Sequence, residues 1–130
     1  MKKTIGFIVV LVLIIAIGIV CGIVNMPEKS EATLEQQLAC KKAETLLETS
    51  AHSYQGLIDS LEFAGFTHED AVYAVDRCGA DWNKQAYRQA KSYKTYNNFS
   101  REETIRMLTF WDGFTREQAI YAVDTADIYK

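Results

Sequence analysis

The chain has 130 residues, with 17 acidic side chains against 14 Lys and Arg, and a formal net charge of −3 at pH 7. Every acidic residue lies beyond residue 24, together with 12 of the 14 basic ones, so this later part carries about −5. An acidic domain of this kind repels nucleic acid and favours basic partners. The composition therefore disfavours a nucleic-acid-binding protein.

An uncharged apolar run occupies residues 5–24, and two lysines precede it. Twenty helical residues at about 1.5 Å each span the roughly 30 Å of a bilayer's hydrocarbon core. Because the lysines come first, the positive-inside bias places the N-terminus in the cytoplasm and residues 25–130 outside. We predict a transmembrane anchor over residues 1–24, and a single-pass protein of the cell membrane with an extracellular C-terminal domain.

Two alternatives remain for this segment. A cleaved signal peptide also begins with lysines, but its apolar region is usually shorter, and no Ala-x-Ala site follows here. A lipoprotein would carry its lipid on Cys21, which makes Cys21 a candidate lipidation site, although the preceding Val20 is branched where lipoprotein signals have a small residue. All three interpretations place the folded part outside the cytoplasm.

After a linker over residues 25–30, the chain contains a tandem repeat. The string at 65–76 returns at 113–124 with nine of its twelve positions identical. Equivalent residues of the two copies are 48 positions apart in this string but 47 apart before it, as in the pairs Ser53/Ser100 and Leu61/Leu108. The second copy therefore has one extra residue near positions 110–112. A duplication this sharp indicates one structural unit used twice.

The repeated string has the pattern of a helix that follows a glycine turn. Thr67 and Thr115 are hydroxyl N-caps with an acceptor side chain three residues on, which is the form of a capping box. Ser53 and Ser100 begin an earlier helix in the same way. Each copy is therefore predicted to contain a helix-turn-helix.

A further helix is predicted between the two copies. Asp81 is a natural N-cap, and the apolar spacing that follows continues to about Tyr96. We expect this helix to be shared, so that residues 31–80 form the first helical repeat and residues 81–130 form the central helix and the second helix-turn-helix repeat. No segment shows a clear alternation of apolar and polar residues that would predict a strand. The predicted fold class is all-α, with an N-terminal transmembrane helix before the tandem repeat.

The chain offers little for catalysis or metal binding. Its only histidines are His52 and His68, and the counterpart of His68 in the second copy is Arg116. The ligand spacings of zinc or calcium sites are missing. We predict a protein that binds, without enzymatic activity, cofactor or metal. Cys40 and Cys78 are expected to be two packed thiols, with a disulfide as the alternative, since one is permitted outside the cell.

The acidic side chains on the predicted helices are the candidate binding residues. The set is Asp59, Glu62, Glu69, Asp70 and Asp76 in the first copy, with Glu117 and Asp124 in the second. A solvated surface is the simpler interpretation of any one of them. The repeated pair Asp76/Asp124 ranks higher because it survives in both copies. The acids at the start of each repeated helix also argue against DNA recognition, which needs Arg, Lys, Asn or Gln there.

Residues 54–76, followed by Cys-Gly-Ala-Asp-Trp at 78–82, resemble the repeat of the Ltp-type host cell surface-exposed lipoproteins. The resemblance covers roughly residues 39–126. It implies a prophage-encoded protein that displays a tandem helix-turn-helix domain on the outer face of the membrane and blocks DNA injection by a second phage. The implied partner is the incoming phage's tape measure protein. The sequence departs from the family in two places. The residue before Cys21 is the branched Val20, where lipoprotein signals have a small residue, and the second copy lacks the Gly-Leu-Ile-Asp string of the first.

We therefore expect a membrane-anchored superinfection exclusion protein that acts by binding the tape measure protein or another phage injection component. The main alternative is a cell-envelope interaction module that binds wall polymer or a host surface protein. A third hypothesis is a UBA-like peptide binder, which the Gly-Phe-Thr-x-Glu-x-Ala string also fits, although the predicted outward topology argues against it.

Overall fold

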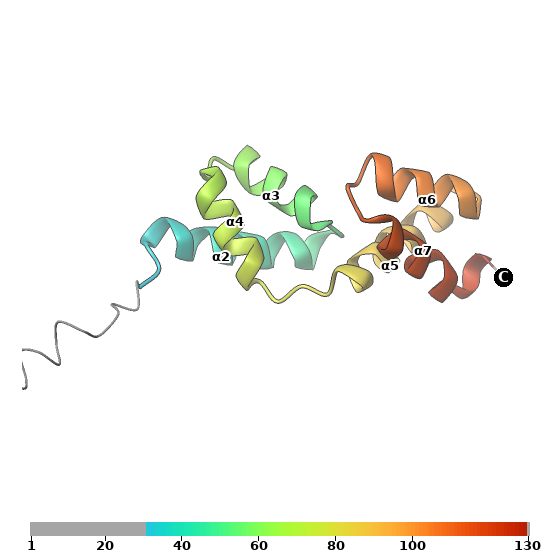
Figure 1. The fold of residues 1–130 in the computed structure, drawn as a ribbon, viewed down its shortest axis with the longest axis horizontal. Coiled ribbons are helices and arrows are strands. Elements are labelled where there is room, and N and C mark those ends of the chain that lie inside the picture. Colours follow the sequence, from blue (N-terminus) through green and yellow to red (C-terminus); the bar gives the residue numbers. More distant parts are fainter. Residues whose placement is uncertain (1–30, 130) are drawn as a thin grey trace, which may run out of the picture. The chain divides into compact units, whose positions relative to one another are not determined.

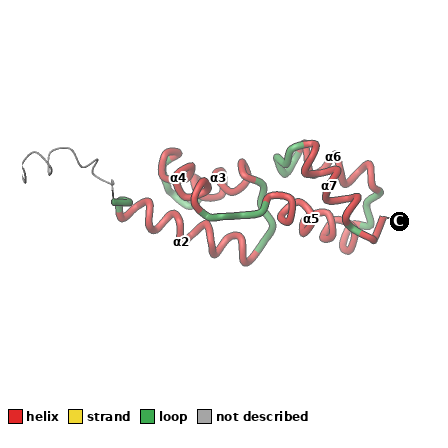
Figure 2. The backbone as a smooth tube through the Cα atoms, turned by 60° about the horizontal axis from the view of Figure 1, so that its bottom comes forward, coloured by secondary structure: helices red, strands yellow, loops and turns green. Residues whose placement is uncertain are grey.

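The computed structural model describes residues 31–129, and within this range every regular element is a helix (Figures 1 and 2). The elements are α2 (Leu34–Thr49), α3 (Tyr54–Phe63), α4 (His68–Arg77), α5 (Trp82–Ser92), a π-helical turn η1 (Tyr93–Asn97), α6 (Arg101–Phe110), α7 (Arg116–Thr125) and a 3-10 turn η2 (Asp127–Tyr129). The all-α prediction is confirmed for this part of the chain. The predicted anchor over 1–24, the linker over 25–30 and Cys21 lie outside the described residues.

None of the helices between residues 31 and 129 has both the length and the apolar character that crossing a bilayer would require.

The helix starts lie where the local pattern places them. Thr67, Ser100 and Thr115 each accept a hydrogen bond from a backbone N–H three residues on. At Ser100 and Thr115 the reciprocal bond completes the capping box. At Thr67 it does not, because the shorter side chain of Asp70 accepts the Thr67 hydroxyl at 2.8 Å instead.

Each repeat is a three-helix unit with its own core, α2–α4 in the first and α5–α7 in the second (Figure 1). Small side chains let the first and third helices approach closely, and both contribute fully buried alanines. The buried alanines are Ala39, Ala43, Ala71 and Ala74 in the first core, and Ala86, Ala90, Ala119 and Ala122 in the second. Leu61 and Leu108, the equivalent large residues of the middle helices, are fully buried in their own cores.

Helix α5 contributes less to the first repeat than we expect of a helix shared by both repeats. Its alanines belong to the second core, where it packs mainly against α7, so it is the first helix of the second repeat. Only Trp82, at its first turn, packs against the first core, and its ring meets that of Tyr54 edge-on at 5.6 Å. In the second repeat Tyr129, also beyond the third helix, packs against the core. An aromatic ring therefore covers each core after its third helix.

The two repeats are joined by a buried polar contact that involves the extra residue of the second copy. With Ala64 aligned to Trp111 and Gly65 to Gly113, Asp112 is the residue without a counterpart. The backbone carbonyl of Asp112 accepts a hydrogen bond from the hydroxyl of Ser53, which is 1% exposed and also caps α3. The inserted residue thus links the second repeat to the start of α3.

Two further contacts support this junction. Arg88 of α5 donates to the carbonyl oxygen of Leu47 at 2.7 Å, and it also donates to Gln85 at 3.1 Å. The Gln85 side chain is buried and accepts from the backbone N–H of His52 at 3.4 Å. The polar residues of α5 therefore contact the last turn of α2 and the segment that follows it.

Cys40 and Cys78 are free thiols, and both pack against the first core, as expected. The Cys78 thiol donates to the carbonyl oxygen of Val75 at 3.1 Å. Burial raises the pKa of Cys40, and this effect exceeds the opposing influence of Arg77.

Candidate functional site

The acidic residues predicted as binding residues do not form one site. All but the half-buried Asp70 are exposed, and they are divided between two repeats with separate cores. Within the first repeat, Asp59 accepts from the side-chain amide of Gln55 at 2.8 Å, and Glu62 pairs with the exposed His68 at 3.1 Å. These two carboxylates lie one turn apart on α3.

The repeated pair Asp76/Asp124 has a structural explanation. Asp76 accepts a hydrogen bond from the Tyr54 hydroxyl at 2.7 Å, and Asp124 accepts an ion-paired bond from Arg101 at 2.6 Å. Tyr54 and Arg101 are equivalent positions, each the first residue of its repeat's middle helix. The carboxylate therefore ties the third helix to the start of the second in both repeats. This contact explains why both copies retain the residue without invoking a partner.

The negative charge of the domain is concentrated in the first repeat. Residues 31–80 contain nine acidic and three basic side chains, a formal charge of −6, whereas residues 81–130 contain seven acidic and eight basic ones, a charge of +1. Two of the differences fall on equivalent positions, Asp59 to Arg106 and His68 to Arg116. A basic partner is therefore attracted to the first repeat and much less to the second.

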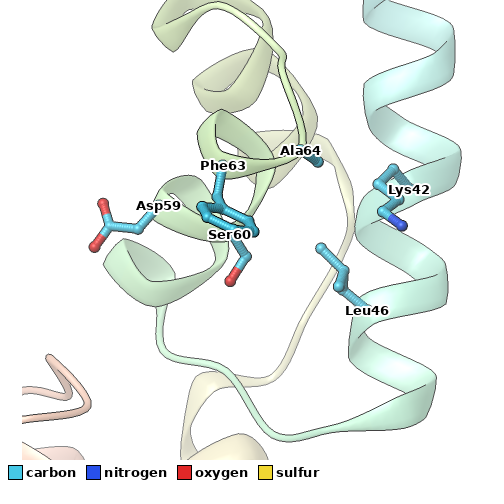
Figure 3. A pocket seen from close by; sticks show the side chains of 6 residues that line it. All are labelled: Lys42, Leu46, Asp59, Ser60, Phe63 and Ala64. Atoms are coloured by element: carbon cyan, nitrogen blue, oxygen red, sulfur yellow. The ribbon is translucent and has the colours of Figure 1, made fainter.

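A mostly apolar groove of about 650 Å³ lies between α2 and α3 of the first repeat (Figure 3). Lys42 and Leu46 line it from α2, and Asp59, Ser60, Phe63 and Ala64 line it from the α3 side. In Figure 3 the Phe63 ring projects from α3, and the Asp59 carboxylate points away from α2. The groove thus has a mostly apolar lining that includes one acid.

The second repeat bridges the corresponding positions with its own side chains. Leu46 is replaced by Tyr93, whose hydroxyl donates to the carboxylate of the inserted Asp112 at 2.8 Å. Burial raises the pKa of Asp112, an effect that its bonds from Tyr93 and Gln89 oppose. A tyrosine ring and its hydrogen bond therefore connect the start of η1, directly after α5, to the loop after α6.

Exposed aromatic residues are the feature that sequence reasoning missed. Phe63 is 96% exposed, and its equivalent Phe110 is 77% exposed beside Trp111 at 72%. The signal was available in the sequence, because the 47-residue offset aligns the two phenylalanines and the helical period places Phe63 away from the buried stripe of Leu57, Ile58 and Leu61. An exposed phenylalanine therefore recurs at this position in both repeats.

The described residues contain no group of three or more His, Cys, Asp or Glu side chains that could hold a metal ion. His52 is half-buried beside the junction, where burial and the nearby Arg88 lower its pKa, and its ring is hydrogen-bonded to Ser50 at 2.9 Å. The arrangement can bind a partner through apolar and acidic contacts.

These features define an all-helical tandem-repeat domain made of two three-helix units. The model of the host cell surface-exposed lipoprotein family matches residues 34–77 and again residues 81–125. The chain therefore belongs to this family, in agreement with the resemblance of its repeat.

Among solved structures, the chain is similar to Ltp, a superinfection exclusion protein from the Streptococcus thermophilus temperate phage TP-J34. The two share 33% sequence identity with a TM-score of 0.69, over 72% of this chain and 97% of the Ltp chain. No curated relative matches the chain.

Proposed function

We propose that this protein is a superinfection exclusion protein that acts at the cell surface. The observation that carries the proposal is the similarity to Ltp, which extends over nearly the whole of that chain and both repeats of this one. The family description, a host cell surface-exposed lipoprotein, supports the same location.

The protein would act by binding a component that an incoming phage uses to inject DNA, in particular its tape measure protein. The charge of −6 on the first repeat supports a partner with basic segments. The 96% exposed Phe63 supports a contact made by an apolar ring. No catalytic step is required, because occupying the injection component is enough to stop DNA entry.

The apolar run over residues 5–24 would hold the domain at the membrane, either as a transmembrane anchor or as a signal that ends in lipidation of Cys21. Radiolabelled palmitate incorporation distinguishes these, because Cys21→Ser abolishes labelling only if the cysteine carries the lipid.

Expression of the full chain in a phage-sensitive host tests the function. Phage adsorption should remain intact, while DNA entry, followed as potassium efflux or as protection of labelled phage DNA from nuclease, should fall. Unchanged plaque counts and DNA entry across a broad panel of phages would refute the proposal.

A second candidate function is binding of an anionic wall polymer, and one feature of the second repeat favours it. A groove of about 350 Å³ runs along α6 and the start of α7. Three arginines and one acid line it together with Ile105 and Thr109: Arg101, Arg106, Arg116 and Glu102. Arginines bind phosphate groups well. Co-sedimentation of the protein with purified cell walls, before and after removal of teichoic acid, separates this function from phage exclusion.

A further inference from the structure

We propose that the groove between α2 and α3 of the first repeat is the docking site for a basic amphipathic helix of the partner. One large apolar side chain of that helix enters between Leu46 and Phe63, and a Lys or Arg one turn away reaches Asp59. The identity of the partner as a phage injection component rests on the function proposed above. The groove itself is argued from the chain's own two repeats.

The second repeat carries a larger side chain at one of the corresponding positions. There Tyr93 stands in place of Leu46, and its hydroxyl is bound by Asp112, the inserted residue. The first repeat has neither the larger ring nor the inserted acid, and its groove is open. An aromatic or long aliphatic side chain from outside would therefore occupy space that an internal tyrosine occupies in the other repeat.

The apolar lining of the groove continues onto an exposed ring. Phe63 lines the groove and is 96% exposed, so this phenylalanine contributes almost nothing to the first core. Leu46, on the opposite wall, packs against that core from its other side and is held in place. A partner side chain between them would remove both from water, which is the usual arrangement of a binding hot spot.

Charge selects a basic helix as the occupant. Asp59 lines the groove with its carboxylate pointing away from α2 (Figure 3). Glu62 lies one turn further along α3. Both belong to the repeat with a charge of −6, whereas Lys42 on the α2 wall repels basic groups from that side. A helix that presents an apolar residue and a basic residue three or four positions apart would meet the groove and Asp59 together.

Two equivalent phenylalanines provide a matched test. Phe63→Ser alters the groove, and Phe110→Ser makes the same change at the corresponding exposed position of the second repeat. Leu46→Tyr fills the groove with the residue that the second repeat carries there. The probes are fluorescent synthetic peptides that tile the tape measure proteins of the phage panel, and binding to the full chain in mild detergent is read as fluorescence anisotropy. Melting temperatures near that of the wild type verify that each variant is folded.

We expect basic amphipathic peptides to bind the wild type. Phe63→Ser and Leu46→Tyr should each weaken this binding by about tenfold or more, and Phe110→Ser by less than about twofold, as expected for a hot spot and a position outside it. In the host, the first two variants should lose exclusion and the third should retain it.

The outcomes separate the groove from the proposed function. If the wild type excludes phage and both groove variants exclude equally well, the groove proposal is wrong and the function stands. If the wild type excludes no phage, the proposed function is wrong, and the groove proposal is then tested by peptide binding alone. Peptide binding that depends on Phe63 supports the groove proposal. Absence of such binding, preference for acidic peptides, or equal dependence on Phe110 overturns it.

Discussion

Replacement of Ser53 by alanine tests whether the two repeats are held together by a buried hydrogen bond. The Ser53 hydroxyl accepts from the backbone N–H of Gly56 at 2.9 Å, which caps α3, and donates to the carbonyl oxygen of Asp112 in the other repeat. The substitution therefore removes two interactions at once. Its equivalent, Ser100, caps α6 in the same way but is exposed to solvent.

The pair of substitutions isolates the contact between repeats. Loss of an N-cap costs about 1 kcal/mol, and this is the whole expected effect of Ser100→Ala. Ser53→Ala also leaves the Asp112 carbonyl without its donor in a partly buried place. We expect this to cost about 1–3 kcal/mol more. We expect the free energy of unfolding to fall by roughly 2–4 kcal/mol for Ser53→Ala.

Urea denaturation of the full chain in mild detergent, followed by circular dichroism at 222 nm, measures both losses. Equal losses for Ser53→Ala and Ser100→Ala would refute the reasoning, because the hydrogen bond to Asp112 would then contribute nothing. A change in the denaturant slope for Ser53→Ala alone would indicate that the two repeats no longer unfold together.

Three further predictions concern buried polar groups. Because the folded pKa of Asp112 is raised, the folded chain binds more protons than the unfolded chain between the ordinary Asp pKa of about 3.9 and that raised value. Stability relative to Asp112→Asn should therefore increase as the pH falls through this window in urea titrations, and a parallel pH dependence of the two proteins would contradict the assignment. The raised pKa of Cys40 predicts alkylation by iodoacetamide at pH 8 more slowly than glutathione, measured by mass spectrometry on peptides; an equal rate would show that the thiol is accessible. Tyr129→Phe removes the hydroxyl that is hydrogen-bonded to the fully buried Thr104 at 2.7 Å, and should lower the free energy of unfolding by about 1–3 kcal/mol in the same urea assay. A loss near zero would show that Thr104 finds another partner within its helix.

The differences between the two copies become intelligible only in three dimensions. Gly56 and Glu103 are equivalent positions three residues after an N-cap serine. Glu103 completes a capping box at the exposed start of α6. A side chain at Gly56 would begin 3.0 Å from the Ser53 hydroxyl and 3.5 Å from the Asp112 carbonyl oxygen, so the first copy has a glycine where the loop of the second repeat approaches.

The acidic residues show the limit of reasoning from pattern. Recurrence in both copies ranked Asp76 and Asp124 above the other acids, yet each binds the first residue of its repeat's middle helix. The pairs are 22 and 23 residues apart in sequence. A contact at that separation leaves no trace in helical periodicity, so retention for folding and retention for binding look the same in the sequence.

The sequence by itself determined the all-α class, the duplication, and the starts of the helices at Ser53, Thr67, Asp81, Ser100 and Thr115. These depend on interactions between residues three or four positions apart, which a local pattern records directly. The tertiary structure alone decided which acids are already engaged, that Asp112 joins the repeats, and that the groove beside Phe63 is open while Tyr93 bridges its counterpart. Each of these depends on which side chain from a distant helix fills a given space.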